Sequence, residues 1–175
     1  MPLQHQNKLA TTIPFTLKST LARLPERKTD GAIGYDTTSI ISTIIEPGKT
    51  LKIPTGLSCA IPKGMYMRLA TRSSHAVKGI SVKGGVIDND YRGEIQVIIH
   101  NSSTTPFLIS TGDRIAQMIF ERASKPLLNV TTHLPPTDRD DQGFGHSHRS
   151  RKRRKEQTRL KRRRGVVHTS TESIY

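Results

Sequence analysis

The sequence predicts an all-β domain of the barrel or sandwich type, followed by a basic tail. Residues 39–69 hold short apolar runs that end at turns such as Glu46-Pro47-Gly48 and Pro62-Lys63-Gly64. Short strands separated by glycine and proline turns are typical of all-β folds. The chain contains four Phe, four Tyr and no Trp. We therefore expect a core built from Ile, Val and Leu.

The formal net charge of +14 is concentrated near the C-terminus, where residues 149–164 hold 11 of the 28 Lys and Arg residues. Residues 1–148 carry 17 Lys and Arg against 12 Asp and Glu, so that part is only about +5. Two basic clusters separated by a short spacer match a bipartite nuclear localisation signal, read by an import receptor. A solvated tail and a nucleic-acid-binding segment that contacts phosphates are the alternatives.

Three further features limit the class of protein to which the chain can belong. The single Cys59 excludes an intrachain disulfide and a cysteine metal cage. No apolar run is long enough to span a membrane, and no secretory signal is recognisable. We expect a nuclear or cytoplasmic, non-secreted protein without a membrane partner. Its expected parts are an N-terminal strand or arm (1–20), a β domain (21–148, with a C-terminal arm at 121–148) and a disordered basic tail (149–175).

The first half of the chain contains six expected strands. Alternating apolar residues predict the first within residues 13–24, and proline 25 ends that region. A short strand carries Tyr35 and Asp36, and the others are expected at residues 40–45, 51–53, 57–61 and 65–69. Cys59 lies inside the strand at residues 57–61 and is interpreted as a small buried hydrophobe.

Arg72-Ser73-Ser74 offers one cation, two hydroxyl groups and free backbone amides, which suit an anion such as phosphate. The alternative is one short helical turn capped by a serine, and both interpretations can hold together. His75 is interpreted as a surface histidine, because no second histidine stands at metal-ligand spacing.

The stretch from Gly84 to Glu94 predicts a tight β-hairpin that organises the chain. Val86 and Ile87 form its first strand, Asn89-Asp90 its turn, and residues 95–99 its return strand. Two carboxylates, a tyrosine and an arginine would then stand on a stiff element, which suits catalysis.

Residues 107–110 and 113–120 predict the last two strands. Alternation places Gln117 on a face with Ile115 and Ile119, so its amide needs a partner, either a ligand or a backbone group. Asp113 and Arg114 are expected to form an ion pair at the turn. Three prolines in residues 121–138 predict an extended arm. The arm leads to the stretch Arg139 to Gly145.

Together these segments resemble the five motifs of the trimeric dUTPase family, in the family's order. The resemblance covers roughly residues 21–148 and is most specific in the third and fourth segments. The matching stretches are Gly34-Tyr35-Asp36, Arg72-Ser73-Ser74, Gly85-Val86-Ile87-Asp88-Asn89-Asp90-Tyr91-Arg92-Gly93, Gly112-Asp113-Arg114-Ile115-Ala116-Gln117, and Arg139 to Gly145.

The resemblance implies a distorted jelly-roll or β-barrel subunit, a homotrimer with active sites shared between subunits, and hydrolysis of dUTP to dUMP and pyrophosphate with Mg²⁺. This reaction limits uracil in DNA. Asp88 would be the general base for the attacking water. Asp36 would reach the metal through water. The residues expected to bind substrate are Arg72, Ser73, Ser74 and Gln117 (phosphates), Gly85, Val86, Ile87 and Gln96 (uracil), Tyr91 (deoxyribose), Phe144 (stacking on uracil), and Arg139 with Gly145 (closing segment).

The chain departs from the family in one place. After Gly143-Phe144-Gly145 it reads His146-Ser147-His148, where the family usually has Ser-Thr-Gly. This departure keeps open a non-catalytic trimer that binds nucleic acid or protein through its tail. A dCTP deaminase-like enzyme, which shares the superfamily fold, is the other alternative.

Overall fold

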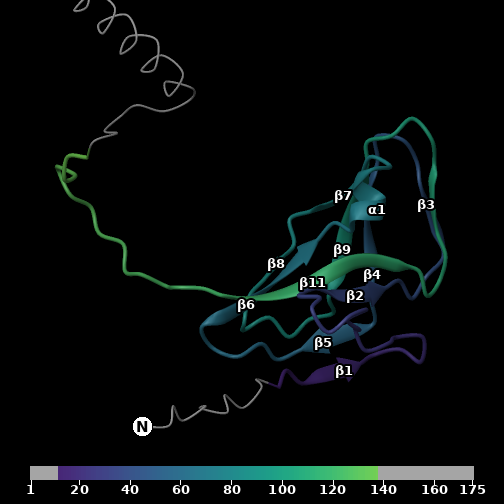
Figure 1. Cartoon of the computed structure of the whole chain (residues 1–175), viewed down its shortest axis with the longest axis horizontal. Helices are drawn as coiled ribbons and strands as arrows, with labels where there is room; N and C mark the ends of the chain where they lie inside the picture. The colour runs from purple at the N-terminus through teal and green to yellow at the C-terminus, as the bar shows by residue number, and fades with distance from the viewer. Residues whose placement is uncertain (1–11, 138–175) are drawn as a thin grey trace, which may run out of the picture. The chain divides into compact units, whose positions relative to one another are not determined.

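Eleven short strands and one helical turn make up residues 12–137, the part of the chain that this computed structural model describes (Figure 1). The all-β prediction is confirmed. In chain order the elements are β1 (Phe15–Leu17), β2 (Tyr35–Thr38), β3 (Thr43–Ile45), β4 (Thr50–Pro54), β5 (Leu57–Cys59), β6 (Met65–Ala70), α1 (Ser73–Ala76), β7 (Ile80–Lys83), β8 (Val86–Ile87), β9 (Gln96–Asn101), β10 (Phe107–Ile109) and β11 (Arg114–Arg122). Within residues 12–137, no helix has the length and apolar character needed to cross a membrane.

The strands form four sheets, in which all pairs are antiparallel. Their orders are β1-β5, β10-β3, β4-β9-β7 and β2-β11-β6-β8. The nine-residue β11 pairs with β2 on one side and β6 on the other, so it is an inner strand of the four-stranded sheet (Figure 1). Its register shifts between Arg114 and Ala116. Because of this bulge, Ile115 and Ala116 are both buried and simple alternation fails.

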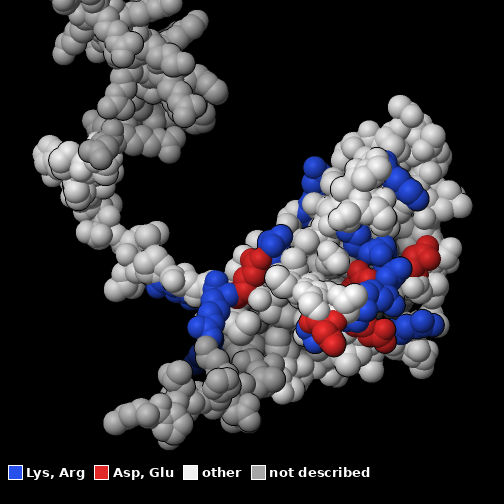
Figure 2. Space-filling view, in the orientation of Figure 1, with Lys and Arg blue, Asp and Glu red and all other residues white. Residues whose placement is uncertain are grey.

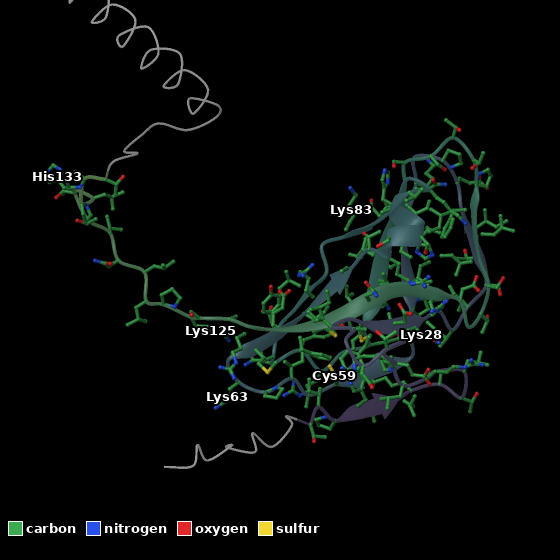
Figure 3. All side chains as sticks on the ribbon, in the orientation of Figure 1. Lys28, Cys59, Lys63, Lys83, Lys125 and His133 are labelled. Atoms are coloured by element: carbon green, nitrogen blue, oxygen red, sulfur yellow. The ribbon has the colours of Figure 1, made fainter. Side chains whose placement is uncertain are left out.

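The core is aliphatic, as the composition predicts. Eight of its fifteen buried members are isoleucines, and Met67 and Met118 are also fully buried. Cys59 is 6% exposed and lies inside the body (Figure 3), which confirms its interpretation as a small buried hydrophobe. Burial raises the pKa of its thiol, against a smaller lowering by Arg92.

Contacts divide the chain into two units, residues 1–126 and 127–175. All of the described strands lie in the first unit. In the second, residues 127–137 are described and contain no helix or strand. β11 includes Glu121 and Arg122, which pair with Tyr66 and Met65 and so belong to the sheet rather than to the expected arm.

The predicted hairpin at residues 84–99 is wrong in its pairing. β8 pairs with β6, while β9 pairs with β4 and β7. The turn itself is present, because the Tyr91 N–H donates to the Asp88 carbonyl at 3.2 Å. Alternating hydrophobicity identifies strand residues but not their partners, which are chosen by burial in the whole fold.

Candidate active site

The polar cluster at one end of β11 is built around Asp36, which is 9% exposed. One carboxylate oxygen accepts Arg72 Nε at 3.1 Å, and the other accepts Arg114 Nη1 at 3.0 Å. Arg72 Nη1 also donates to the Arg114 carbonyl oxygen at 3.1 Å. Three segments far apart in sequence are thus joined, and the cluster carries a net formal charge of one positive unit.

Strand register brings Gln117 to the same place. Gln117 in β11 pairs with Asp36 in β2 and with Ala70 in β6. A Cβ on Gly34 would lie 3.2 Å from the Gln117 Cβ, so glycine at this position leaves room for the Gln117 side chain. The first, second and fourth segments of the sequence analysis therefore meet at one end of the four-stranded sheet.

Two local expectations are corrected here. Arg114 does not pair with Asp113 but with Asp36, because β11 and β2 are adjacent. Asp113 instead accepts the Ser110 N–H at 2.8 Å and closes the turn before β11. The short helical turn after the second segment is confirmed. Its N-terminal boundary residue, however, is Arg72, and no side chain caps it.

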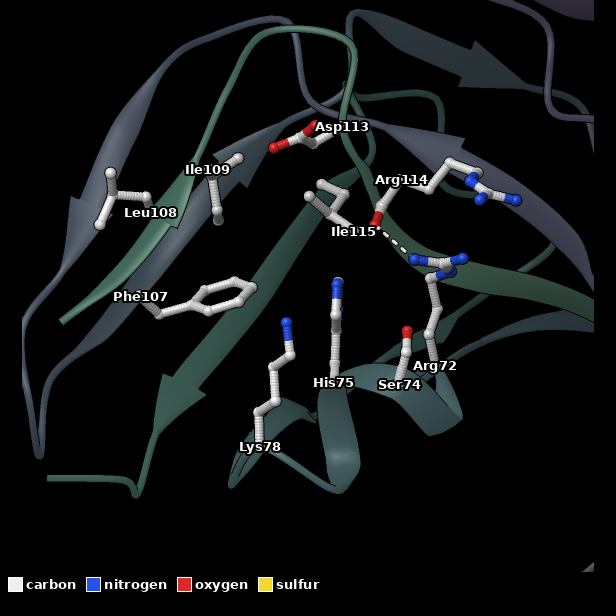
Figure 4. Close-up of a pocket in the computed structure, with 10 residues that line it drawn as sticks. All are labelled: Arg72, Ser74, His75, Lys78, Phe107, Leu108, Ile109, Asp113, Arg114 and Ile115. Carbon is white, nitrogen blue, oxygen red and sulfur yellow. Dashed lines mark hydrogen bonds between the residues drawn. The ribbon is translucent and has the colours of Figure 1, made fainter. Parts of the chain in front are cut away.

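A pocket of about 330 Å³ opens between α1, β10 and the start of β11 (Figure 4). Its apolar side includes Phe107, Ile109 and Ile115, and its polar side includes Arg72, Ser74 and Lys78. Sequence reasoning missed this pocket. Lys78 lies in the turn that follows α1, and nothing in the sequence connects Phe107 to α1.

His75 is not the surface residue expected from the sequence. It is half-buried in this pocket, and its ring meets Phe107 edge-on at a centroid distance of 5.2 Å (Figure 4). Burial lowers the pKa of His75 below 6.5, and the charges of Arg72 and Lys78 act in the same direction. A hydrogen bond to the Ile115 backbone and the charge of Asp113 oppose that shift.

The glycines before β8 allow the third segment to approach β6. Gly85 has φ of +92°, and a Cβ there would lie 2.7 Å from the Leu69 carbonyl oxygen. The Leu69 N–H donates to the Gly85 carbonyl at 2.8 Å. Hydrogen-bonding residues alternate along an antiparallel strand, so the Val86 N–H and carbonyl face outward from β8, which is an edge strand.

The loop after β8 is held by its own residues. Tyr91 donates its hydroxyl to the Glu94 carbonyl at 2.9 Å, and Arg92 Nη1 donates to the carbonyls of Asn89 and Tyr91. Glu94 accepts the Gly56 N–H at 2.8 Å, which anchors the loop to the body. The Asp88 carboxylate is exposed and has no hydrogen bond or ion pair within residues 12–137.

Within a single chain, Asp88 lies far from the Asp36 cluster. Ile87 pairs with Met67 in antiparallel register, so Asp88 lies toward the Tyr66 end of β6, whereas Arg72 follows the other end. The six steps along the backbone from Tyr66 to Arg72 span roughly 20 Å at about 3.3 Å per extended residue. Gln96 is exposed at the start of β9, where it pairs with Pro54.

Several expected site residues lie outside the described part of the chain, namely Arg139, Phe144 and Gly145, as do the basic residues 149–164. Within residues 12–137, no group of three or more His, Cys, Asp or Glu side chains is arranged to hold a metal ion. The described body shows Lys and Arg interspersed with Asp and Glu on the face in Figure 2.

Known proteins match this chain over its body. The dUTPase family model matches residues 20–148. A deoxyuridine 5'-triphosphate nucleotidohydrolase of Monkeypox virus is 45% identical over 133 residues, which cover 76% of this chain and 88% of that protein. The protein of the same description from Vaccinia virus (strain Copenhagen) is 44% identical over 133 residues, with coverages of 76% and 90%.

Solved structures of dUTPases have a fold similar to that of this chain. A mutant dUTPase of Staphylococcus bacteriophage 80alpha with dUpNHpp has a TM-score of 0.74 at 25% identity, covering 78% of this chain and 98% of that chain. A mutant dUTPase from phage phi11 of S. aureus, described for its coordination of a structural Mg(II) ion, has a TM-score of 0.66 at 25% identity, covering 70% and 98%. The fold and the matches define an all-β enzyme that acts on nucleotides. The chain belongs to the dUTPase family.

Proposed function

We propose that this chain hydrolyses dUTP to dUMP and pyrophosphate. The observation that carries the proposal is the exposed carboxylate of Asp88, which stands on a loop fastened by its own residues in a member of the dUTPase family. Fastened loops hold a catalytic group in place. A carboxylate with no internal partner remains available to a water molecule.

In the proposed reaction, Asp88 orients a water molecule and accepts one of its protons as the water oxygen attacks the α-phosphorus. The bond from that phosphorus to the bridging oxygen breaks, and pyrophosphate leaves with the electron pair. Positioning and proton transfer of this kind each supply a large part of a rate enhancement.

Base selection would fall to the edge of β8. The outward N–H and carbonyl of Val86 fit the O4 and N3–H of uracil. Cytosine has a donor (the 4-amino group) where uracil has the O4 acceptor, and an acceptor (N3) where uracil has the N3–H donor. It would leave both backbone groups of Val86 unpaired, which strongly disfavours its binding. Tyr91 would pack against the deoxyribose. The Gly85 carbonyl already accepts the Leu69 N–H, so it contributes shape rather than recognition.

The phosphates would be held by Arg72, Ser73, Ser74 and Gln117, with Arg139 from the closing segment. Phe144 of that segment would stack on the uracil. The implied Mg²⁺ fits this site only through the substrate and water. Both oxygens of Asp36 already accept arginine N–H groups, and each keeps one further lone pair for a water molecule. When bound, the ion neutralises charge on the triphosphate and keeps much of its hydration.

We propose a homotrimer in which each active site takes Asp88 from one chain and Arg72 from another. The support is the separation of roughly 20 Å between these residues along β6. Mixing two variants tests it. Asp88→Asn and Arg72→Ala should each be inactive alone, but co-refolded mixtures should regain up to about a quarter of wild-type activity, because some interfaces combine two intact halves. A mixture as inactive as its components would place the whole site in one chain.

The test of the activity is pyrophosphate release from dUTP with Mg²⁺, beside dCTP, dTTP and UTP. We expect turnover of dUTP alone. Ammonia release from dCTP would instead indicate the deaminase chemistry of the superfamily. A folded trimer that releases neither product would support the non-catalytic alternative.

For residues 149–164 we propose a nuclear localisation signal. The segment lies beyond the family match, which ends at residue 148, and 11 of its 16 residues are basic. A reporter fused to these residues should enter the nucleus, and replacing one basic cluster with Gln and Ser should abolish entry. A reporter that stays cytoplasmic but is retained on nucleic acid in a strongly salt-dependent way would favour the alternative.

A further inference from the structure

The pocket between α1 and β10 contains a lysine to which neither the family motifs nor the proposed mechanism gives a role. Lys78 lines the pocket, and Figure 4 shows its ammonium group pointing into the space between Phe107 and His75. Lys78 is exposed and forms no ion pair or side-chain hydrogen bond within residues 12–137. It is therefore a cation available to a ligand.

The arginines of the same pocket are largely committed to other partners. Arg72 donates through Nε to Asp36 and through Nη1 to the Arg114 carbonyl, and Arg114 donates to Asp36. Asp36 neutralises one of these two charges. A triphosphate carries several negative charges, so the arginines alone leave most of that charge without a counterpart.

We propose that Lys78 binds the pyrophosphate part of the nucleotide, in the pocket that it shares with Arg72 and Ser74. This inference rests on the proposed function. It assigns the pocket as the subsite for the two outer phosphates and for the pyrophosphate product, and Lys78 as a substrate-binding residue.

The walls of the pocket favour this assignment. Phe107, Ile109 and Ile115 form an apolar side, which reduces screening of the ammonium charge by water. Asp113 is the acidic residue of the lining, and one of its oxygens accepts the Ser110 N–H. Its negative charge opposes an anion but is outnumbered in the lining by the positive charges of Arg72, Lys78 and Arg114.

The test is calorimetric titration of the full-length protein with pyrophosphate and, separately, with dUMP. The variants are Lys78→Met, which removes the charge, Lys78→Arg, which keeps it, and Lys52→Met, which removes an exposed lysine of β4 as a control. The basic tail is identical in all of them, so its contribution cancels. Lys78→Met should weaken pyrophosphate binding about tenfold, as expected for one charge-assisted hydrogen bond. dUMP binding should stay unchanged, and the two other variants should behave as wild type.

Equal pyrophosphate affinity in Lys78→Met and wild type would overturn the inference. So would an equal loss for dUMP, because it would indicate a general disturbance of the site. Neither readout depends on turnover, so failure of the inference is distinct from failure of the proposed function, which absence of dUTP hydrolysis would reveal. If dUTP is hydrolysed, Lys78→Met should also raise KM about tenfold with kcat little changed, because the lysine would bind ground state and transition state alike.

Discussion

The Asp36 cluster and the Asp88 loop differ in the burial and in the hydrogen-bond partners of their carboxylates. In the cluster, three segments meet, and each oxygen of a buried carboxylate accepts an N–H from one of two arginines. In the loop, residues 89–94 bond mainly to one another, and the carboxylate at its start is exposed and unpaired within the described chain. Both regions contain an aspartate that the family resemblance marks as functional, but their surroundings differ.

The difference indicates that the Asp36 carboxylate has a structural role and that the Asp88 carboxylate is available for reaction. A carboxylate that already accepts two charged donors is held in place and contributes to stability, whereas a carboxylate without partners can accept a proton from water. We expect substitutions in the two regions to affect different quantities, namely activity at Asp88 and stability at Asp36.

The largest expected effect is on catalysis at Asp88. Asp88→Asn should lower kcat for dUTP by about a thousandfold, since general-base catalysis contributes 10²–10⁴-fold. The free energy of unfolding should change by less than about 0.5 kcal/mol, because the side chain is exposed. Pyrophosphate release and urea unfolding measure the two quantities. Asp90→Asn, two residues along the same turn, is the control and should keep most of the activity. If Asp88→Asn and Asp90→Asn lowered kcat equally, Asp88 would not be the general base.

The next effect is on stability at Asp36. Asp36→Asn should destabilise the fold by about 2–4 kcal/mol, because it leaves two arginines without their buried counter-charge. Urea unfolding measures this change. Adding Arg114→Met should recover part of the loss, as expected for residues in one network. Asp113→Asn, which loses only an acceptor at an exposed turn, should cost less than about 1 kcal/mol. If Asp36→Asn were as mild as Asp113→Asn, the cluster would not stabilise the fold.

A third comparison isolates the glycine that lets β8 approach β6. Gly85→Ala should cost roughly 2 kcal/mol, because φ is +92° and the new Cβ would meet the Leu69 carbonyl oxygen. Gly48→Ala is the matched control, since φ is +72° but nothing lies within 4 Å. It should cost only about 1 kcal/mol from the backbone conformation. Similar unfolding free energies for the two variants would show that close approach to Leu69 adds nothing.

The sequence predicted what depends on local pattern. The strand positions, the aliphatic core, the burial of Cys59 and the helical turn after Arg72 follow from alternation, composition and turn residues, and all are present. It did not predict pairing. The partner of β8 is β6, and the partner of Arg114 is Asp36, 78 residues away. It missed β7 and the contact of His75 with Phe107. Such choices depend on how separate segments share one core, which no local pattern encodes.

The smallest expected effect concerns the pH dependence of stability at His75, which lies beside the cluster. The charged groups that act on its ring are Arg72, Lys78 and Asp113, and the Arg114 side chain of the same pocket is directed to Asp36. Folding lowers the pKa of His75 below its usual 6.5, so below that pH the unfolded chain binds more protons than the folded one. The contribution of His75 to stability is thus fully present above pH 6.5 and is lost as pH falls through its folded pKa. His75→Leu removes this contribution. Melting temperatures from pH 8 to pH 5 should therefore fall less steeply for His75→Leu than for wild type. Identical slopes would mean that the imidazole titrates as freely in the folded protein as in the unfolded chain.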